Sequence, residues 1–149
     1  MTAKIARGAL IAALYAVVTI ILQPISFRYL QVRVAEALTL LPVLFPEAVP
    51  GLFIGCLISN IYGGLGPIDI LLGSLTTLAA AWLTYTWRGS WIAYLPPVVL
   101  NGVIVGVYLS YLLHVNILLA VGSVALGEAI AVLVLGVPLL KRLQKMNLR

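Results

Sequence analysis

The fold is decided by residues 31–69, which read QVRVAEALTLLPVLFPEAVPGLFIGCLISNIYGGLGPID. Apolar runs fill this stretch, but acidic residues stand near both of its ends, at Glu36 and Asp69, and the Pro46-Glu47 step divides it. A charged side chain at the centre of a membrane-spanning helix costs about 2.5 to 3.5 kcal/mol on insertion scales. Because the surrounding sequence is so apolar, each of these charges needs a partner or a functional reason.

The composition indicates an integral membrane protein. Of the 149 residues, 63% are hydrophobic and 9% are charged, and the mean hydropathy is +1.17. That leaves too little polar surface to enclose a soluble core. The formal net charge of +5 does not indicate a nucleic-acid partner, because the basic residues gather at the two chain ends beside apolar spans. No stretch resembles a linker, so we expect a single transmembrane domain over residues 1–149.

Six apolar segments predict six transmembrane helices, over residues 5–22, 35–45, 48–62, 67–87, 91–113 and 116–140. The second and third segments are short, and one bent helix through both is the alternative. Six spans put the basic residues of both chain ends on one side, which the positive-inside rule assigns to the cytoplasm, whereas five would leave four basic residues outside. We therefore expect an all-α bundle of six helices with both termini cytoplasmic.

Small residues form one face of the first segment. Gly8, Ala12 and Ala16 recur every fourth residue, and Ala9 and Ala13 lie alongside them. Such a flat face lets another helix backbone come close in lipid, where packing drives helix association. The face either packs inside the same bundle or docks on a partner subunit, and the sequence leaves both interpretations open.

The remaining polar residues predict a substrate site in the outer half of the bundle. The topology puts Glu36, Asn60 and Asp69 at the external ends of their helices, and Asn101 and Glu128 near the middles of the last two. An acid at mid-span by default faces a cavity or a partner, so we expect Glu128 to bind a ligand. The alternative is an internal hydrogen bond between Glu128 and Asn101.

Arg33 and two aromatic residues complete the candidate site. Arg33 lies on the external side, against the topology bias, and the alternative to a functional role is a helical pairing with Glu36 three residues later. For Glu36 and Asp69 the alternative is a solvated helix start, where the helix dipole favours negative charge. Phe27 and Tyr62 are external aromatic residues that could stack on a planar ligand.

Several classes of function lack the residues they need. His114 is the single histidine and Cys56 the single cysteine, so neither a metal site nor a histidine-based catalytic triad is supported. We expect no cofactor and no enzyme activity. The sequence contains no G-x-x-x-x-G-K-[ST] motif, so any ATP-driven transport must take its ATPase from other subunits.

Three stretches carry a family resemblance. VRVAEALTLLP at 32–42, PGLFIGCLISN at 50–60 and DILLGSL at 69–75 resemble the QueT family, and the resemblance runs over nearly the whole chain. This family comprises substrate-binding S components of energy-coupling factor (ECF) transporters assigned to queuosine precursors.

The resemblance implies a six-helix S component in a bacterial cell membrane. It would capture a queuosine precursor, a 7-deazaguanine such as queuine or aminomethyl-deazaguanine, from outside. It would dock through the small-residue face of the first helix on a membrane T component carrying two cytoplasmic ATPase subunits. Gly8 stands where the family's docking pattern usually has its first alanine, which leaves the face flat.

Two other classes of function stay open from the residues alone. A stand-alone facilitator or a proton-coupled carrier for a small polar metabolite would use Glu128 as its proton site. A membrane enzyme is the least supported class, because the sequence shows no metal-ligand cluster and no nucleophile with an evident base.

Overall fold

The computed structural model describes residues 1–22 and 33–146, and all the elements within these residues are helical. α1 (Thr2–Ile21) is followed by the 3₁₀ helix η1 (Val34–Val43) and by α3 (Ala48–Gly63). The next helical rod, residues 67–86, joins the π-helical segment η2 (Asp69–Gly73) to α4 (Ser74–Thr86).

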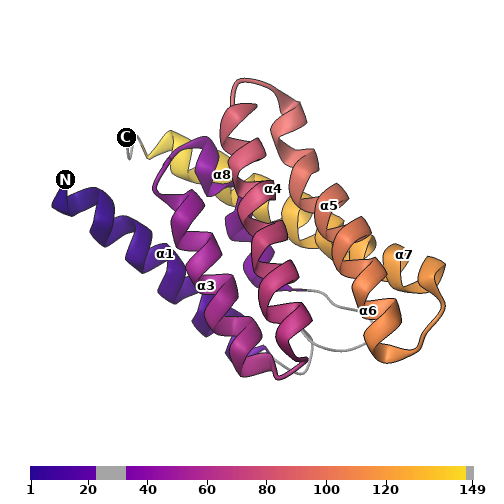
Figure 1. Ribbon diagram of the computed structural model, residues 1–149. Coiled ribbons are helices and arrows are strands. Elements are labelled where there is room, and N and C mark those ends of the chain that lie inside the picture. The colour runs from indigo at the N-terminus through magenta and orange to yellow at the C-terminus, as the bar shows by residue number, and fades with distance from the viewer. Residues whose placement is uncertain (23–32, 147–149) are drawn as a thin grey trace.

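Two longer rods complete the bundle, and each contains a π-helical segment. The first runs through η3 (Trp91–Tyr94), α5 (Leu95–Leu100), the π-helical η4 (Asn101–Val105) and α6 (Gly106–Leu113). The second runs through α7 (Ile117–Ala129), the π-helical η5 (Ile130–Gly136) and α8 (Val137–Lys145). Figure 1 shows the rods passing back and forth between two ends of the bundle, with the N- and C-termini at the same end.

Three of the described rods are long and apolar enough to cross a membrane: Thr2–Ile21, Trp91–Leu113 and Ile117–Lys145. η1 and α3 are apolar but shorter, and the rod of residues 67–86 carries Asp69 together with several threonines. The large side chains exposed on the rods are mostly apolar, as a surface facing lipid requires. The fold is therefore that of an all-helical membrane protein, while six membrane crossings with cytoplasmic termini remain a prediction.

One expected boundary is confirmed and another differs. The Pro46-Glu47 turn separates η1 from α3, so these are two helices and not one bent helix. η1 is a 3₁₀ helix that contains Pro42, which has no N–H to donate to the turn before it. The last rod continues to Lys145, so the predicted end at residue 140 was wrong. Basic residues in its last turn favour this extension, because they interact well with the negative end of the helix dipole.

Glycines allow α1 and α3 to pack closely. A methyl group built at Gly51 would lie 2.6 Å from the backbone oxygen of Gly8, and one built at Gly55 would lie 2.7 Å from that of Ala12. Beside this contact Tyr15 is fully buried with apolar residues of η1 and α3. The backbone-to-backbone approach that small residues permit in lipid therefore occurs inside this chain.

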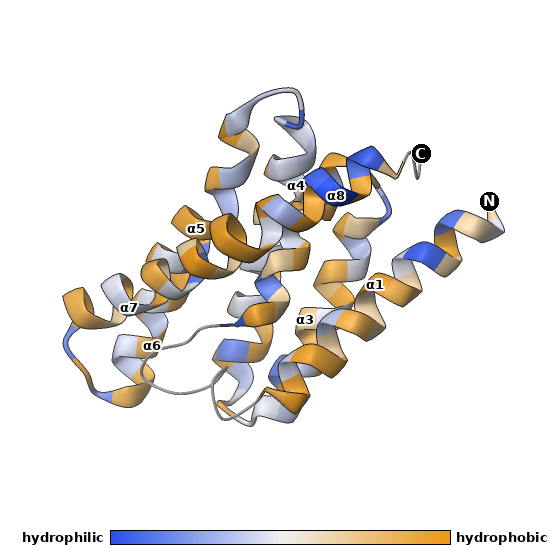
Figure 2. Ribbon diagram, turned by 180° about the vertical axis from the view of Figure 1, so that it is seen from behind, coloured by the Kyte–Doolittle hydropathy of each residue, from blue (hydrophilic) through white to orange (hydrophobic). Residues whose placement is uncertain are grey.

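Charged side chains gather at the end of the bundle that holds both termini. Arg7 Nη1 on α1 donates a 2.8 Å hydrogen bond to Oε1 of Glu47 in the turn before α3. Figure 2 shows hydrophilic residues near the start of α1 and along α8, at this same end. The rods between the two ends are predominantly hydrophobic in that view.

Candidate functional site

Six polar residues of the predicted site are buried inside the bundle. Their exposed fractions do not exceed 5%, and they come from five elements: Arg33 and Glu36 at the start of η1, Asn60 on α3, Asp69 on η2, Asn101 on η4 and Glu128 on α7. Glu36 and Asp69 are 1% and 0% exposed. Their burial excludes the alternative of a solvated helix start, so these charges must be stabilised by protein groups or by a ligand.

Glu36 joins three elements through its two carboxylate oxygens. The Tyr15 hydroxyl on α1 donates a hydrogen bond to Oε1, and Nδ2 of Asn101 on η4 lies 3.4 Å from Oε2. Asn101 also interacts with Glu128, so the contact that the sequence left open as the alternative to a ligand role for Glu128 is present. One amide therefore stands between two carboxyl groups from η1 and α7.

Asp69 is the centre of a second group of contacts. Its Oδ1 accepts a 2.6 Å hydrogen bond from the Tyr108 hydroxyl on α6 and lies 3.8 Å from Nη2 of Arg33. Nδ2 of Asn60 donates a 3.0 Å hydrogen bond to the backbone oxygen of Asp69. Gly73 provides the room, because a methyl group there would lie 2.8 Å from both Asn60 Nδ2 and Tyr108 Oη.

Arg33 connects the two groups of contacts. Its guanidinium interacts electrostatically with Asp69, with Glu36 and with Glu128. The pairing between Arg33 and Glu36 that the sequence left open is thus one of three such interactions. With every carboxyl group ionised, three negative charges would face one positive charge among these four residues. Such a site favours a ligand that brings hydrogen-bond donors or a positive charge.

Three buried oxygen atoms in the cluster lack a hydrogen-bond partner among the described residues: Asn60 Oδ1, Asp69 Oδ2 and Glu128 Oε2. A buried polar atom left without a hydrogen bond costs about 1 to 3 kcal/mol. All three are acceptors, so a ligand with several N–H groups would satisfy them. Each carboxylate oxygen can accept more than one hydrogen bond, so a carboxylate could accept two adjacent N–H groups even where one of its oxygens already has a partner.

The irregular helical segments coincide with the polar residues. Asp69 begins η2, Asn101 begins η4, and Glu128 lies two residues before η5. π-helical turns are rare and often occur at functional sites, where they alter which side chains face inward. Each of the three π-helical segments thus begins at or just after a buried polar residue of the cluster, which supports a functional role for this part of the bundle.

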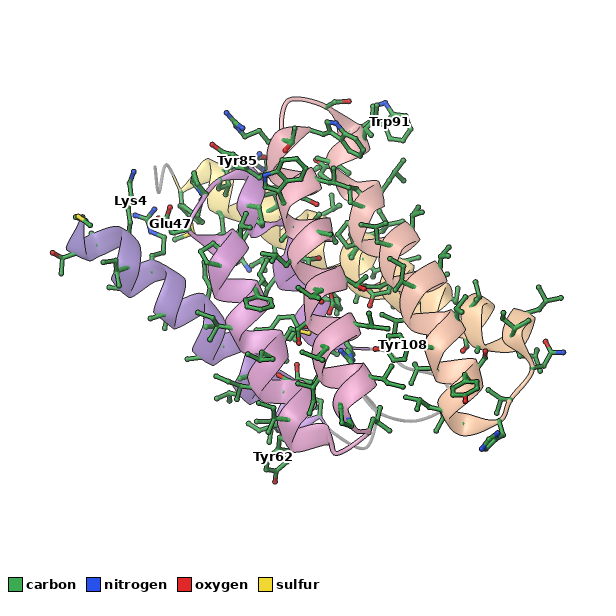
Figure 3. The ribbon with its side chains drawn as sticks, viewed as in Figure 1. Lys4, Glu47, Tyr62, Tyr85, Trp91 and Tyr108 are labelled. Atoms are coloured by element: carbon green, nitrogen blue, oxygen red, sulfur yellow. The ribbon has the colours of Figure 1, made fainter. Side chains whose placement is uncertain are left out.

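Sequence reasoning missed two tyrosines that the site uses. Tyr15 and Tyr108 donate hydrogen bonds to Glu36 and Asp69, and Figure 3 shows Tyr108 pointing into the bundle. The signal for Tyr15 was its position on α1 between Ala12 and Ala16, where a polar hydroxyl at mid-span needs an acceptor.

The two aromatic residues predicted to stack on a ligand are not part of the described cluster. Tyr62 is 59% exposed, and its side chain projects outward from the end of the bundle that lies opposite the termini (Figure 3). Phe27 lies outside the described residues. The stacking partner of a planar ligand therefore stays a prediction.

The small residues of α1 divide between two surroundings. Gly8 and Ala12 approach α3 closely, and Ala12 and Ala16 are each 6% exposed. Ala9 and Ala13 are exposed, and together with Gly8 and Ala12 they line an apolar groove of about 550 Å³ between α1 and α3. Ala12 and Ala16 are thus buried in the bundle, Gly8 is half-buried at the groove, and Ala9 and Ala13 remain available to a partner.

Comparison with known proteins identifies a family. The family model of the QueT transporter matches residues 5–145, which is nearly the whole chain. The comparisons with curated proteins and with solved structures found no match. The family match agrees with the resemblance of the three central motifs and with a membrane protein that moves a small molecule. The chain belongs to the QueT transporter family.

Proposed function

We propose that this protein is the substrate-binding membrane subunit of an ECF-type importer and that it captures a queuosine precursor from outside the cell. The observation that carries the proposal is the convergence of Arg33, Glu36, Asn60, Asp69, Asn101 and Glu128 in one buried cluster. Membership of a transporter family supports a small-molecule substrate for that cluster.

The chemistry of a 7-deazaguanine suits these side chains. Its Watson–Crick edge presents adjacent N–H donors, which one carboxylate can accept together. Queuine and aminomethyl-deazaguanine also carry an amine, which favours a second acid. We propose that Glu128, which has a carboxylate oxygen without a partner in the described residues, accepts the base edge, and that Asp69 accepts the amine through its Oδ2.

Other side chains hold the acids Glu36 and Asp69 of the cluster in position. Tyr15 and Asn101 hold Glu36, while Arg33 and Tyr108 hold Asp69. A carboxylate fixed in this way loses less conformational freedom when the ligand arrives, which improves affinity. Stacking on the planar base stays a prediction, because Tyr62 points away from the cluster and Phe27 lies outside the described residues.

Delivery of the substrate requires partners in this proposal. Six spans with cytoplasmic termini would put the small residues of α1 within the bilayer, where Ala9 and Ala13 are exposed to a neighbouring helix. We propose that a membrane T component docks there and that two cytoplasmic ATPase subunits drive transport. Within residues 1–149 the sequence offers no P-loop of its own.

Direct binding of the ligand tests the proposal. The purified protein should bind aminomethyl-deazaguanine in isothermal titration calorimetry, and Glu128→Gln or Asp69→Asn should weaken binding at least about tenfold, or about 1.4 kcal/mol. Glu47→Gln is the matched control, because Glu47 is the acid outside the cluster and pairs with Arg7. If Glu47→Gln weakened binding as much as the other two substitutions, the roles assigned to Glu128 and Asp69 would be contradicted.

A transport assay separates the proposal from its alternative. Liposomes that contain this protein alone should not accumulate the deazaguanine, because the importer needs its ATPase subunits. Uptake by such liposomes would instead support a stand-alone facilitator or a proton-coupled carrier. Abolition of that uptake by Glu128→Gln would identify Glu128, whose buried Oε2 lacks a described partner, as the proton site.

A further inference from the structure

A basic cavity lies at the end of the bundle that holds the termini, away from the polar cluster. Its volume is about 450 Å³, and its charged lining residues are Lys4 and Arg7 on α1, Glu47 before α3 and Arg88 after α4. Three basic groups and one acidic group leave two positive charges in excess. Figure 3 shows Lys4 and Glu47 beside each other at this end of the molecule.

Both arginine side chains of the cavity are held in place. The Arg7 guanidinium lies 4.5 Å from the centre of the Phe45 ring and donates to Glu47. The Arg88 guanidinium lies 4.3 Å from the centre of the Tyr85 ring and donates a 3.0 Å hydrogen bond to the Tyr85 backbone oxygen. Arginines fixed on aromatic rings present their remaining N–H groups in set directions, which suits an anionic group such as a phosphate.

The apolar groove between α1 and α3 adjoins this cavity. Lys4 and Glu47 line both, and the groove continues along Ala9, Ala13, Ile54 and Ile58. A ligand that occupies both spaces must have an anionic head and an apolar tail. Trp87 and Trp91, which flank Arg88 in the sequence, are 42% and 68% exposed, as tryptophans at the level of lipid headgroups are.

We propose that this end of the protein binds an anionic phospholipid, with the headgroup phosphate in the basic cavity and one acyl chain in the groove. Basic pockets between helices at the cytoplasmic interface are suited to anionic lipid headgroups. The pairing of Glu47 with Arg7 reduces the repulsion between that carboxylate and the phosphate. Because Ala9 and Ala13 line the groove, a helix that docks on them would displace the acyl chain.

Native mass spectrometry of the full-length protein tests this inference. The protein is offered phosphatidylglycerol and phosphatidylcholine with the same acyl chains in equal amounts. Phosphatidylglycerol should be retained about fivefold or more over phosphatidylcholine, and Lys4→Gln/Arg88→Gln should reduce its retention on the order of tenfold. This double variant leaves the pair of Arg7 and Glu47 intact. Equal retention of the two lipids by the unchanged protein would overturn the proposal.

Two further measurements distinguish a lipid site from general charge attraction and from a site for free anions. Lys141→Gln/Lys145→Gln removes two exposed charges outside the cavity, and this variant should still retain phosphatidylglycerol over phosphatidylcholine. If it lost as much phosphatidylglycerol as Lys4→Gln/Arg88→Gln does, the lipid would be held by general charge attraction, and the proposed site would be overturned. Inorganic phosphate should not raise the melting temperature as phosphatidylglycerol does. An equal rise with inorganic phosphate would show that the cavity binds free anions, and it would overturn the proposal of a lipid site. Neither measurement involves substrate or transport, so failure would leave the proposed function untouched.

Discussion

Gly73→Ala should disturb the candidate site without removing any of its polar groups. The added methyl would lie 2.8 Å from Asn60 Nδ2, 2.8 Å from Tyr108 Oη and 3.4 Å from Asp69 Oδ1. Contacts below 3.0 Å are essentially never seen at a Cβ atom, so the contacts to both Asn60 and Tyr108 must lengthen. Movement of Tyr108 would break its 2.6 Å hydrogen bond to Asp69.

The expected magnitude follows from two opposing contributions. Loss of a hydrogen bond to a charged group costs about 1.5 to 3 kcal/mol. Replacement of glycine by alanine inside a helix contributes about 0.5 to 1 kcal/mol in the other direction. We therefore expect a decrease of about 0.5 to 2.5 kcal/mol in the free energy of unfolding. Affinity for a ligand held by Asp69 should fall as well, by about tenfold for each 1.4 kcal/mol.

Gly122→Ala is the matched control for this experiment. Gly122 lies within the exposed part of α7, and a methyl group there would meet no atom within 4 Å. Thermal unfolding in detergent should show Gly122→Ala unchanged or more stable and Gly73→Ala less stable. Calorimetry with aminomethyl-deazaguanine should show weaker binding only for Gly73→Ala. Equal behaviour of the two variants in both assays would refute the close packing of Tyr108, Asn60 and Asp69.

Two further predictions concern α1. Tyr15→Phe removes the donor to Glu36 and should lower the free energy of unfolding by about 1 to 3 kcal/mol in thermal unfolding; an unchanged melting temperature would mean that Glu36 does not depend on Tyr15. Ala13→Leu should abolish uptake by the assembled importer while ligand binding by the isolated subunit stays intact, because Ala13 is exposed in the groove. Val103→Leu, at another exposed position, is its control, and loss of uptake there too would remove the assigned role of the groove.

The helices were predictable because lipid demands long apolar segments with satisfied backbones. The expected ranges 91–113 and 48–62 agree with the rods Trp91–Leu113 and Ala48–Gly63 to within a residue. The length of the last rod was not predicted, because the residues after Leu140 are polar and a helix leaving the apolar region gives no hydropathy signal. The 3₁₀ form of η1 was also missed, although Pro42 within it was visible.

The polar cluster was predictable in membership but not in its contacts. The cost of a charge in lipid singled out Glu36, Asp69 and Glu128, and the structure brings them together around Arg33. Tyr15 was missed because tyrosine is common in apolar segments, and its mid-span hydroxyl indicates that an acceptor is needed without indicating which residue supplies it. The division of the α1 face was likewise hidden, because a stripe of small residues does not say which helix approaches it.

The balance of charge in the cluster bears on which of the proposed precursors would fit best. Arg33 interacts with all three acids, so no carboxyl group has a positive charge to itself. With every carboxyl group ionised, a neutral base would satisfy acceptors through its N–H groups but would leave the excess of negative charge uncompensated. An aminomethyl group carries the missing positive charge, and in a buried site an ion pair is favourable only when its hydrogen bonds are complete. In the proposed arrangement Asp69 Oδ2 is the acceptor for that amine, while Glu128 Oε2 accepts from the base edge. Among deazaguanines this arrangement therefore favours those with a primary or secondary amine over those with a nitrile.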